Sequence, residues 1–179
     1  EIQTAFVTAI NDMGKVVRVR NLSEVFTEEN SKLDQARVAF LAQLCPELTV
    51  IDDNDHFHNA VAVAVHHDEK KVKEMVTNLI DTIKNHGEPA EIKTFAAKAG
   101  HTDHAHTQSL ASISKHLATL NNRWGLIKWP MVNPKNIRDK IYVILKEHGK
   151  HMHFNEISEA IKGSDFKRKD VTTQAIHNE

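Results

Sequence analysis

Three glycines divide this chain, because each ends an apolar helical pattern and is followed by a second short amphipathic segment. After Gly14, Gly87 and Gly149, apolar or small residues occupy the third, fifth, eighth and twelfth positions. These are Val17, Val19, Leu22 and Phe26; Ala90, Ile92, Phe95 and Ala99; and Met152, Phe154, Ile157 and Ile161. A pattern that recurs after 73 and then 62 residues predicts a tandem array of one small helical module, about 60 residues long.

The first module, residues 1–67, has the element order of a winged helix-turn-helix. A stripe of Phe6, Val7, Ile10 and Met13 predicts a first helix that ends at Gly14. An extended segment at Val17 and Val19, a second helix over Leu22–Phe26 and a third over Ser31–Leu44 follow, the third with Leu33, Val38, Leu41 and Leu44 facing inward. Thr49–Ile51 and Phe57–Val65 then predict a β-hairpin wing.

The second module, residues 68–132, repeats this order. We expect helices over Lys70–Asn85, Ile92–Ala99 and Thr107–Leu120, with a polar linker over His101–His106. A wing strand is expected over Trp124–Trp129, and the two tryptophans are predicted to pack this wing against the third module.

The third module, residues 133–179, begins with a helix from Asn136 that carries Ile137, Ile141, Ile144 and Leu145. Its second helix is expected over Phe154–Ile161 and its third from Asp170 or Thr172. Since the wing would begin only after Glu179, we expect the module to be truncated. The predicted fold class is therefore mainly α with short β-hairpin wings, in three tandem winged helix-turn-helix modules, the last incomplete.

Composition narrows the class of protein. Apolar residues make up 40% of the chain, yet no apolar run has the roughly 20 residues of a membrane span. Without a signal sequence, the chain is expected to be cytoplasmic with no membrane partner. Cys45 is the single cysteine and is interpreted as a small apolar residue near a helix end. The formal charge of −1 is uneven: residues 1–130 hold 14 Lys+Arg and 17 Asp+Glu, and residues 131–179 hold 9 and 7.

From Trp124 onward the chain resembles a known family. The stretches that carry the likeness are Trp124-Gly-Leu, Trp129-Pro, Asn133-Pro, the helix from Arg138 to Gly149-Lys, Met152-His-Phe-Asn-Glu-Ile, and Thr173-Gln-Ala-Ile-His-Asn-Glu. They resemble the HARE-type helix-turn-helix domain, a winged helix of bacterial sigma-factor-like proteins, restriction enzymes and chromatin regulators. That domain is similar to the N-terminal domain of the RNA polymerase delta subunit. The resemblance implies transcription-related DNA binding or contact with RNA polymerase.

The third helix of the third module is the first candidate for duplex DNA contact. Cations precede it and amide or hydroxyl groups populate it, the composition of a helix that lies in the major groove. The candidate residues are Lys167, Arg168, Lys169, Thr172, Thr173, Gln174, His177 and Asn178. An ordinary solvated helix end has the same composition, so both interpretations stay open.

The other two modules give a weaker signal for DNA. In the second, Ser109, Ser112, Lys115, His116 and Arg123 are expected at similar exposed positions, with few cations upstream. In the first, Lys32, Gln35 and Arg37 lie on the third helix, but Asp52, Asp53 and Asp55 in the wing turn would repel phosphate. These modules are therefore expected to bind protein or to act as spacers.

Histidines form two His-x-x-His-x-His patterns: His101, His104 and His106, and His148, His151 and His153. Imidazoles at this spacing can bind zinc or nickel. However, the two patterns stand at different places in their modules, so we interpret them as turn and interface residues and predict no metal and no cofactor. No phosphate-binding glycine loop, nucleophile elbow or paired acidic motif occurs, so we predict that the chain is not an enzyme.

The sequence therefore predicts a transcription-related, sigma-factor-like DNA-binding protein. Its tandem winged helices would contact duplex DNA, RNA polymerase or another transcription protein. The alternative is a protein-interaction scaffold, similar to the delta subunit, that does not touch DNA.

Overall fold

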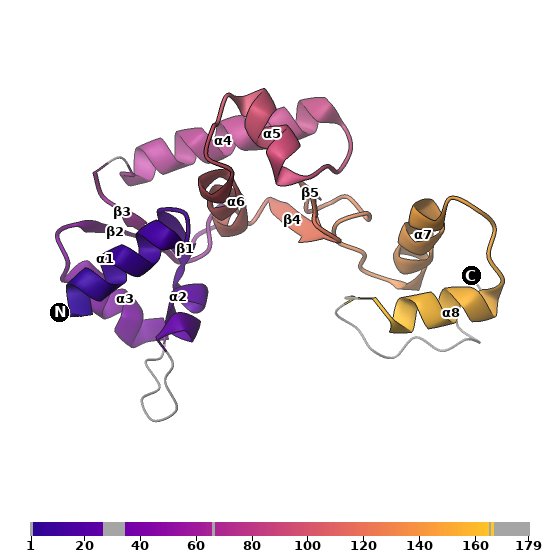
Figure 1. The fold of residues 1–179 in the computed structure, drawn as a ribbon, viewed down its shortest axis with the longest axis horizontal. Coiled ribbons are helices and arrows are strands. Elements are labelled where there is room, and N and C mark those ends of the chain that lie inside the picture. The colour runs from indigo at the N-terminus through magenta and orange to yellow at the C-terminus, as the bar shows by residue number, and fades with distance from the viewer. Residues whose placement is uncertain (1, 27–34, 66, 165, 167–179) are drawn as a thin grey trace.

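The computed structural model of the protein describes residues 2–26, 35–65, 67–164 and 166 (Figure 1). Within these ranges the chain is mostly helical, with a three-stranded and a two-stranded antiparallel sheet. This agrees with the predicted class of helices with small hairpins. None of the described helices is both long enough and apolar enough to cross a bilayer.

Module 1, the name we keep for residues 1–67, has the predicted order of elements. These are α1 (Ile2–Asp12), β1 (Val16–Arg18), α2 (Val19–Val25), α3 (Gln35–Gln43), β2 (Leu48–Ile51) and β3 (Ala60–Val63). The strand order is β1-β3-β2, with Val17 opposite Val61. Val19 is the first residue of α2 and not part of the extended segment.

The inward position predicted for Leu44 is wrong. The helix α3 ends at Gln43, and the Leu44 side chain is 57% exposed. Cys45, one residue later, is buried in the core as expected for a small apolar residue. Val38 is buried as predicted, whereas Leu33 lies outside the described residues.

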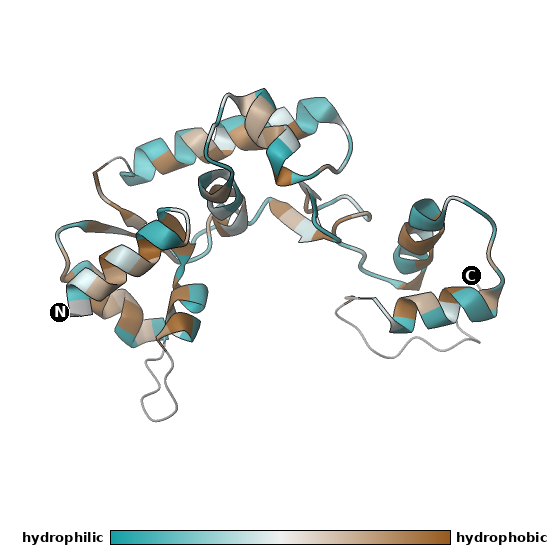
Figure 2. Ribbon diagram, viewed as in Figure 1, coloured by the Kyte–Doolittle hydropathy of each residue, from teal (hydrophilic) through white to brown (hydrophobic). Residues whose placement is uncertain are grey.

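Module 2, residues 68–132, contains α4 (Glu69–His86), α5 (Ile92–Ala99), α6 (His104–Ile113), β4 (Leu117–Leu120) and β5 (Arg123–Leu126). The predictions for α4 and α5 are confirmed. Buried residues recur along one side of α4 at Val72, Val76, Leu79 and Ile83, and Figure 2 shows hydrophilic and hydrophobic residues interleaved along this helix. Gly87 ends α4 in the left-handed conformation (φ 84°), as its sequence position predicts.

The predicted bounds of the third helix and of the wing in module 2 are wrong. The helix α6 begins three residues before Thr107, because the Asp103 carboxylate caps it by accepting from the His106 amide at 3.0 Å. It ends at Ile113, and the residues that we assigned to its second half form β4. Asn121 and Asn122 have φ of 52° and 61°, the backbone of a tight two-residue hairpin turn into β5.

A single β-bridge makes module 2 match module 1 more closely. Ala90, which precedes α5, pairs antiparallel with Trp124 in β5, and their backbone groups exchange hydrogen bonds of 2.8 and 3.2 Å. This bridge has the same place in the order of elements as the pairing of β1 with β3. Each hairpin therefore receives an extra segment on its second strand.

Module 3, residues 133–179, is described as far as its second helix. It contains α7 (Ile137–His148) and α8 (Phe154–Lys162), as predicted. The helix α7 is capped by the Asn136 side chain and ends at Gly149 (φ 71°). Its apolar residues pack with those of α8 around Ile144, Ile157 and Ile161. The third helix that we predicted from Asp170 or Thr172 lies outside the described residues.

Both faces of the module 1 sheet are buried, and this joins modules 1 and 2. Side chains alternate across a strand, so Val17, Leu48 and Val61 enter the core under α1, α2 and α3. The opposite face, with Val16, Ile51, Ala60 and Ala62, packs against residues of α4 and α6 that include Val72, Val76, Leu110 and Ile113. Modules 1 and 2 therefore share a hydrophobic core.

Gly14 is required where α6 approaches module 1. Its φ of 102° is a conformation that residues with a side chain rarely adopt. A Cβ atom at this position would also lie 2.7 Å from the Ala105 carbonyl oxygen of α6 and would overlap the Ser109 hydroxyl. The sequence indicates only a helix end here, whereas the structure adds a contact between modules.

The predicted role of the two tryptophans is wrong. Trp124 is buried in the core of module 2 with Leu79, Ile83 and Phe95, and Trp129 packs against the same cluster. A Cβ at Gly125 would lie 2.6 Å from the Trp129 ring, so this glycine makes room for the indole. Both rings therefore complete the core of module 2 and do not link it to module 3.

Replacing Gly14 and Gly87 by alanine should separate the energetic cost of a positive φ from the cost of a clash with α6. Gly14→Ala adds the cost of a positive φ and a clash with α6, for an expected loss of about 2–4 kcal/mol in the free energy of unfolding. Gly87→Ala is the control, because it has a positive φ but nothing within 4 Å of the added Cβ. It should cost about 1 kcal/mol. Urea unfolding of both variants measures the difference, and equal losses would contradict the close approach of α6.

Candidate nucleic-acid interface

The residues predicted to contact DNA are Lys167, Arg168, Lys169, Thr172, Thr173, Gln174, His177 and Asn178, and all lie outside the described residues. A nucleic-acid interface can therefore be described only among the other residues of the chain. Three features bear on it: the contacts of α6, the distribution of charge over the described surface, and a groove between modules 1 and 2.

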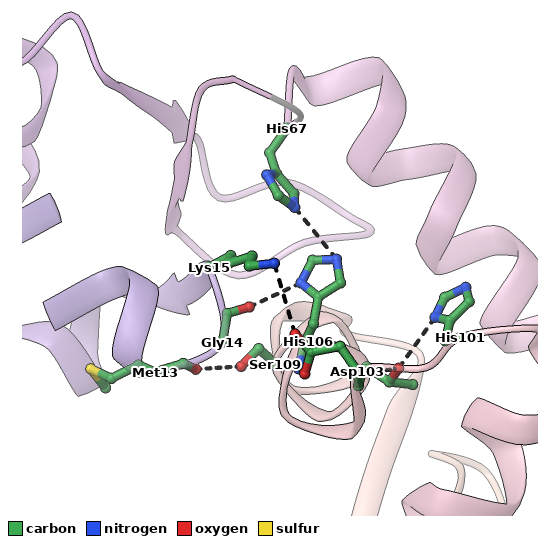
Figure 3. Close-up of polar contacts among 9 residues, drawn as sticks. Met13, Gly14, Lys15, His67, His101, Asp103, His106 and Ser109 are labelled. Carbon is green, nitrogen blue, oxygen red and sulfur yellow. Dashed lines mark hydrogen bonds and ion pairs between the residues drawn. The ribbon is translucent and has the colours of Figure 1, made fainter. Parts of the chain in front are cut away.

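The helix α6 has the third-helix position of module 2, but it faces module 1 (Figure 3). The Ser109 hydroxyl donates to the Met13 carbonyl oxygen at 2.6 Å, and His106 Nδ1 donates to the Gly14 carbonyl oxygen at 2.9 Å. Thr107, Leu110, Ala111 and Ile113 are buried. Ser109 and Ser112, predicted at exposed positions, are instead both half-buried. The Ser109 hydroxyl is engaged by module 1, whereas the Ser112 hydroxyl bonds to the Ser109 carbonyl oxygen within α6.

The residues that follow α6 also bind module 1. Lys115 Nζ lies 2.7 Å from Asp53 Oδ1, and this contact holds the pKa of Asp53 below its usual value. His116 Nε2 lies 2.9 Å from His56 Nδ1. Backbone hydrogen bonds of 2.9 Å run from the His58 amide to the Ile113 carbonyl and from the Lys115 amide to the His56 carbonyl. Of the five candidates in module 2, only Arg123 is exposed and remote from module 1.

Positive charge is concentrated in residues 115–150, which we name the basic segment. It holds eight Lys+Arg and two Asp+Glu, out of 23 and 24 in the chain, so the remainder carries 15 and 22. Arg123, Lys128, Lys135, Lys146 and Lys150 are exposed and make no ion pair with the part of the chain that the structure describes. In Figure 1 the segment runs from β4 and β5 outward to α7.

A side-chain hydrogen bond brings the two ends of the basic segment together. Asn121 Nδ2 in the turn between β4 and β5 donates to Glu147 Oε1 of α7 at 2.7 Å. Arg123 directly follows this turn, and Lys146 and Lys150 flank Glu147 in sequence. The hairpin and α7 thus present cations around one point, where the bond to Asn121 occupies one oxygen of the Glu147 carboxylate.

A groove of about 460 Å³ lies next to β4 and is open to solvent. It is lined by Arg18 and His58 of module 1, by Ser112, Ser114, Leu117, Thr119, Trp124 and Ile127 of module 2, by Val132–Pro134 and by Phe166, among others. The Arg18 side chain makes neither a hydrogen bond nor an ion pair with the described residues. A guanidinium in this position adds positive charge beside the basic segment.

Burial lowers the pKa of two groove residues, Arg18 and His58. Partial burial, and then the charge of Arg20, lower the pKa of Arg18, which nevertheless stays far above neutrality for a guanidinium. Burial also lowers the pKa of His58, with smaller effects from Arg18 and Lys115. His58 is therefore neutral at pH 7 and able to accept or donate a hydrogen bond there.

The third helix of module 1 has a different surface. Phe40 and Leu44 lie one helical turn apart on or beside α3 and are 60% and 57% exposed. The exposed Asp52, Asp53 and Asp55 lie in the loop between β2 and β3. Two exposed apolar side chains and an acidic loop between β2 and β3 are unsuited to phosphate and suited to a protein partner.

Neither histidine pattern forms a cluster of metal ligands. Among the described residues, no group of three or more His, Cys, Asp or Glu side chains converges on a point where an ion could sit. His101 Nδ1 lies 3.2 Å from the Thr107 hydroxyl, and His153 caps α8. His106 instead meets His67, from outside its own pattern, with 3.4 Å between their Nε2 atoms.

Sequence reasoning missed the basic segment and Arg18. The charge count for residues 1–130 and 131–179 divides the segment between two halves and hides its excess of cations. A count over the hairpin and the following helix would have found it. Arg18 gave no such signal, because its groove forms only when α6 packs against module 1.

Comparison of the chain with protein-family models, with curated proteins and with solved structures finds no match.

Proposed function

We propose that this protein binds duplex DNA through the basic segment, as a transcription-related protein built from tandem winged helices. The observation that carries the proposal is the concentration of eight Lys+Arg against two Asp+Glu in residues 115–150. Lys115 pairs with Asp53 and Lys140 is buried, so the cations available to phosphate are the exposed Arg123, Lys128, Lys135, Lys146 and Lys150. Phosphate neutralisation by such cations supplies most of the non-specific affinity of DNA-binding proteins. The resemblance of residues from Trp124 onward to HARE-type domains supports the same function.

The order of elements supports the winged-helix part of the proposal. In module 1 a helix, a strand, two helices and a hairpin follow one another, and the first strand pairs with the last. In module 2 the bridge between Ala90 and Trp124 supplies the equivalent pairing. In winged helices the hairpin reaches the DNA backbone beside the recognition helix, and Arg123 stands at the end of the module 2 hairpin.

The contacts of α6 restrict which elements can meet DNA. A recognition helix must enter the major groove, which is about 12 Å wide. Because α6 is covered by module 1, it cannot do so in this arrangement. We therefore infer that the module 2 hairpin and α7 hold phosphates, and that base contacts come from the predicted helix with Thr172, Thr173 and Gln174.

Removing two cations from the basic segment should weaken DNA binding and flatten its salt dependence. For the full chain, Arg123→Gln/Lys128→Gln should lower the affinity for a short duplex about tenfold at low salt. The slope of log K against log salt should fall in magnitude by about 2, since each phosphate contact contributes about 0.9. Fluorescence anisotropy with a labelled duplex at several salt concentrations measures both quantities.

The matched control removes the same charge elsewhere. Lys70 and Lys84 are exposed on α4, outside the basic segment, so Lys70→Gln/Lys84→Gln should leave the slope unchanged. Lys167→Ala/Arg168→Ala tests the predicted recognition helix in the same assay and should also weaken binding. If Arg123→Gln/Lys128→Gln binds with the same affinity and salt slope as the Lys70→Gln/Lys84→Gln control, the basic segment does not bind phosphate.

A protein-interaction scaffold is the second candidate function, and the apolar surface of α3 favours it. Phe40 and Leu44 expose more than half of their side chains where a DNA-reading helix would carry polar groups. Exposed aromatic and aliphatic anchors of this kind dominate protein interfaces. The partner expected from the resemblance to the delta subunit is RNA polymerase.

Phe40→Ser/Leu44→Ser should abolish binding to purified bacterial RNA polymerase core enzyme if this second function holds. Loss of two central apolar anchors typically weakens an interface by more than a hundredfold. Val65→Ser is the control, because Val65 is 71% exposed but does not belong to α3. Biolayer interferometry measures the affinities. A wild-type chain that does not bind the enzyme, or equal binding by all variants, would exclude α3 as the polymerase contact.

A further inference from the structure

The groove beside β4 is lined by residues from modules 1, 2 and 3. Arg18 and His58 come from module 1, Leu117 and Trp124 from module 2, and Phe166 follows α8. Its volume of about 460 Å³ lies within the range of about 300–1,000 Å³ that small-molecule sites occupy. The size of the groove is therefore suited to a small molecule.

The apolar wall of the groove is fixed by the core of module 2. Leu117 and Trp124 belong to the hydrophobic cluster of that module and are 5% and 6% exposed. Val132, which also lines the groove, is 3% exposed. Because core side chains are close-packed in single rotamers, this wall exists before any ligand arrives. A preformed wall lowers the entropic cost of binding.

The guanidinium of Arg18 supplies a positive charge to the groove. Arg18 is the last residue of β1, and its backbone is held opposite Ala60 of β3. The side chain is half-buried and makes neither a hydrogen bond nor an ion pair within the described ranges. Asp53, the carboxylate whose charge acts on Arg18, is already bound to Lys115 Nζ at 2.7 Å. The five N–H donors of Arg18 are therefore available to an anion.

Two further hydrogen-bond donors line the groove. Ser114 follows α6 and is 2% exposed. Its oxygen accepts from the His116 amide at 3.2 Å, while its own hydrogen has no acceptor in the part of the chain that the structure describes. The half-buried His58 ring makes no hydrogen bond to those residues either. Because this ring is neutral at pH 7, one of its nitrogens carries a hydrogen to donate.

The junction between modules 1 and 2 brings these donors to one groove. The His58 amide donates to the carbonyl oxygen of Ile113, the residue before Ser114, at 2.9 Å. Arg18 pairs with Ala60, two residues after His58, and its charge acts on the His58 ring. Donors that lack an acceptor favour a ligand that only accepts. An ionised carboxylate is such a group, and its two oxygens match the planar fork of a guanidinium.

We propose that this groove binds a small organic acid with an apolar body. The carboxylate accepts hydrogen bonds from Arg18, His58 and Ser114. The apolar body packs against Leu117, Trp124 and Val132. One guanidinium beside a neutral imidazole balances a single negative charge, which favours a carboxylate over a phosphate group with its charge of about −1.5 to −2.

Binding of the acid would stabilise the junction between modules 1 and 2. Arg18 and His58 meet Ser114 only when α6 is packed against module 1. A ligand that binds this arrangement and not the separated modules raises the free energy of unfolding. The site does not depend on the proposed binding of DNA.

An NMR titration of the full, ¹⁵N-labelled chain with 2-naphthoate tests the site. We expect saturable binding of one molecule per chain, with a Kd of about 0.1–1 mM for a ligand of this size. The amides of His58, Ser114 and Leu117 should be among those that shift. Two other compounds separate charge from shape. The amide 2-naphthamide keeps the body without the charge, and acetate keeps the charge without the body, so each should bind about tenfold more weakly or less.

Replacing Arg18 tests the contact with the carboxylate. Arg18→Gln should weaken the binding of 2-naphthoate about tenfold and leave the binding of 2-naphthamide unchanged, because it removes only the charge. Arg20→Gln is the matched control. Arg20 belongs to the same module, is exposed and does not line the groove, so this variant should bind 2-naphthoate like wild type.

The map of shifted amides in the wild-type chain tests the site even if Arg18→Gln does not fold. The proposal is overturned if the wild type does not bind 2-naphthoate, if 2-naphthoate and 2-naphthamide bind equally, or if the shifted amides lie outside the groove. A folded Arg18→Gln that binds the acid like wild type would also overturn it. Displacement of 2-naphthoate by an equal concentration of inorganic phosphate would assign the groove to phosphate and contradict the carboxylate.

Discussion

The rest of this structure depends on the burial of α6 against the second face of the module 1 sheet. Val16, Ile51 and Ala62 would lie in water if module 1 stood alone. Leu110 and Ile113 of α6 cover them, and Gly14 allows the two backbones to approach. Because a small module has a thin core, sharing one between neighbours gives each more buried apolar area than it could form by itself.

The packing of α6 against module 1 determines which surfaces of the two modules stay exposed. The covered helix α6 is no longer available as a DNA-reading element, and its polar side chains bond to the carbonyl oxygens of Met13 and Gly14. Cations instead lie on the module 2 hairpin and on α7, joined through the hydrogen bond of Asn121 to Glu147. On module 1, Phe40 of α3 and the adjacent Leu44 face solvent. The described part of the chain thus carries exposed cations on one surface and exposed apolar side chains on another.

Much of the fold could be predicted from local patterns. The apolar stripes place α4, α5, α7 and α8, and left-handed glycines end the first three of these helices. The predicted ends lie within one residue of the observed ones. The ends of α6 were missed because an aspartate cap and a double-asparagine turn outweigh the apolar periodicity there. The candidate site was harder, since the contacts of α6 and the groove at Arg18 join residues far apart in sequence. One usable signal was the continuous apolar run Ala60–Val63, which is typical of a strand buried on both faces.

Hydrogen exchange at the junction tests the shared core most directly. The His58 and Lys115 amides donate to the carbonyl oxygens of Ile113 and His56 across the modules, whereas the Val63 amide donates to the Lys15 carbonyl within module 1. If modules 1 and 2 form one body, all three amides should exchange slowly and with similar protection. Fast exchange of His58 and Lys115 beside a protected Val63 would show that α6 does not stay on the sheet, and would contradict the account.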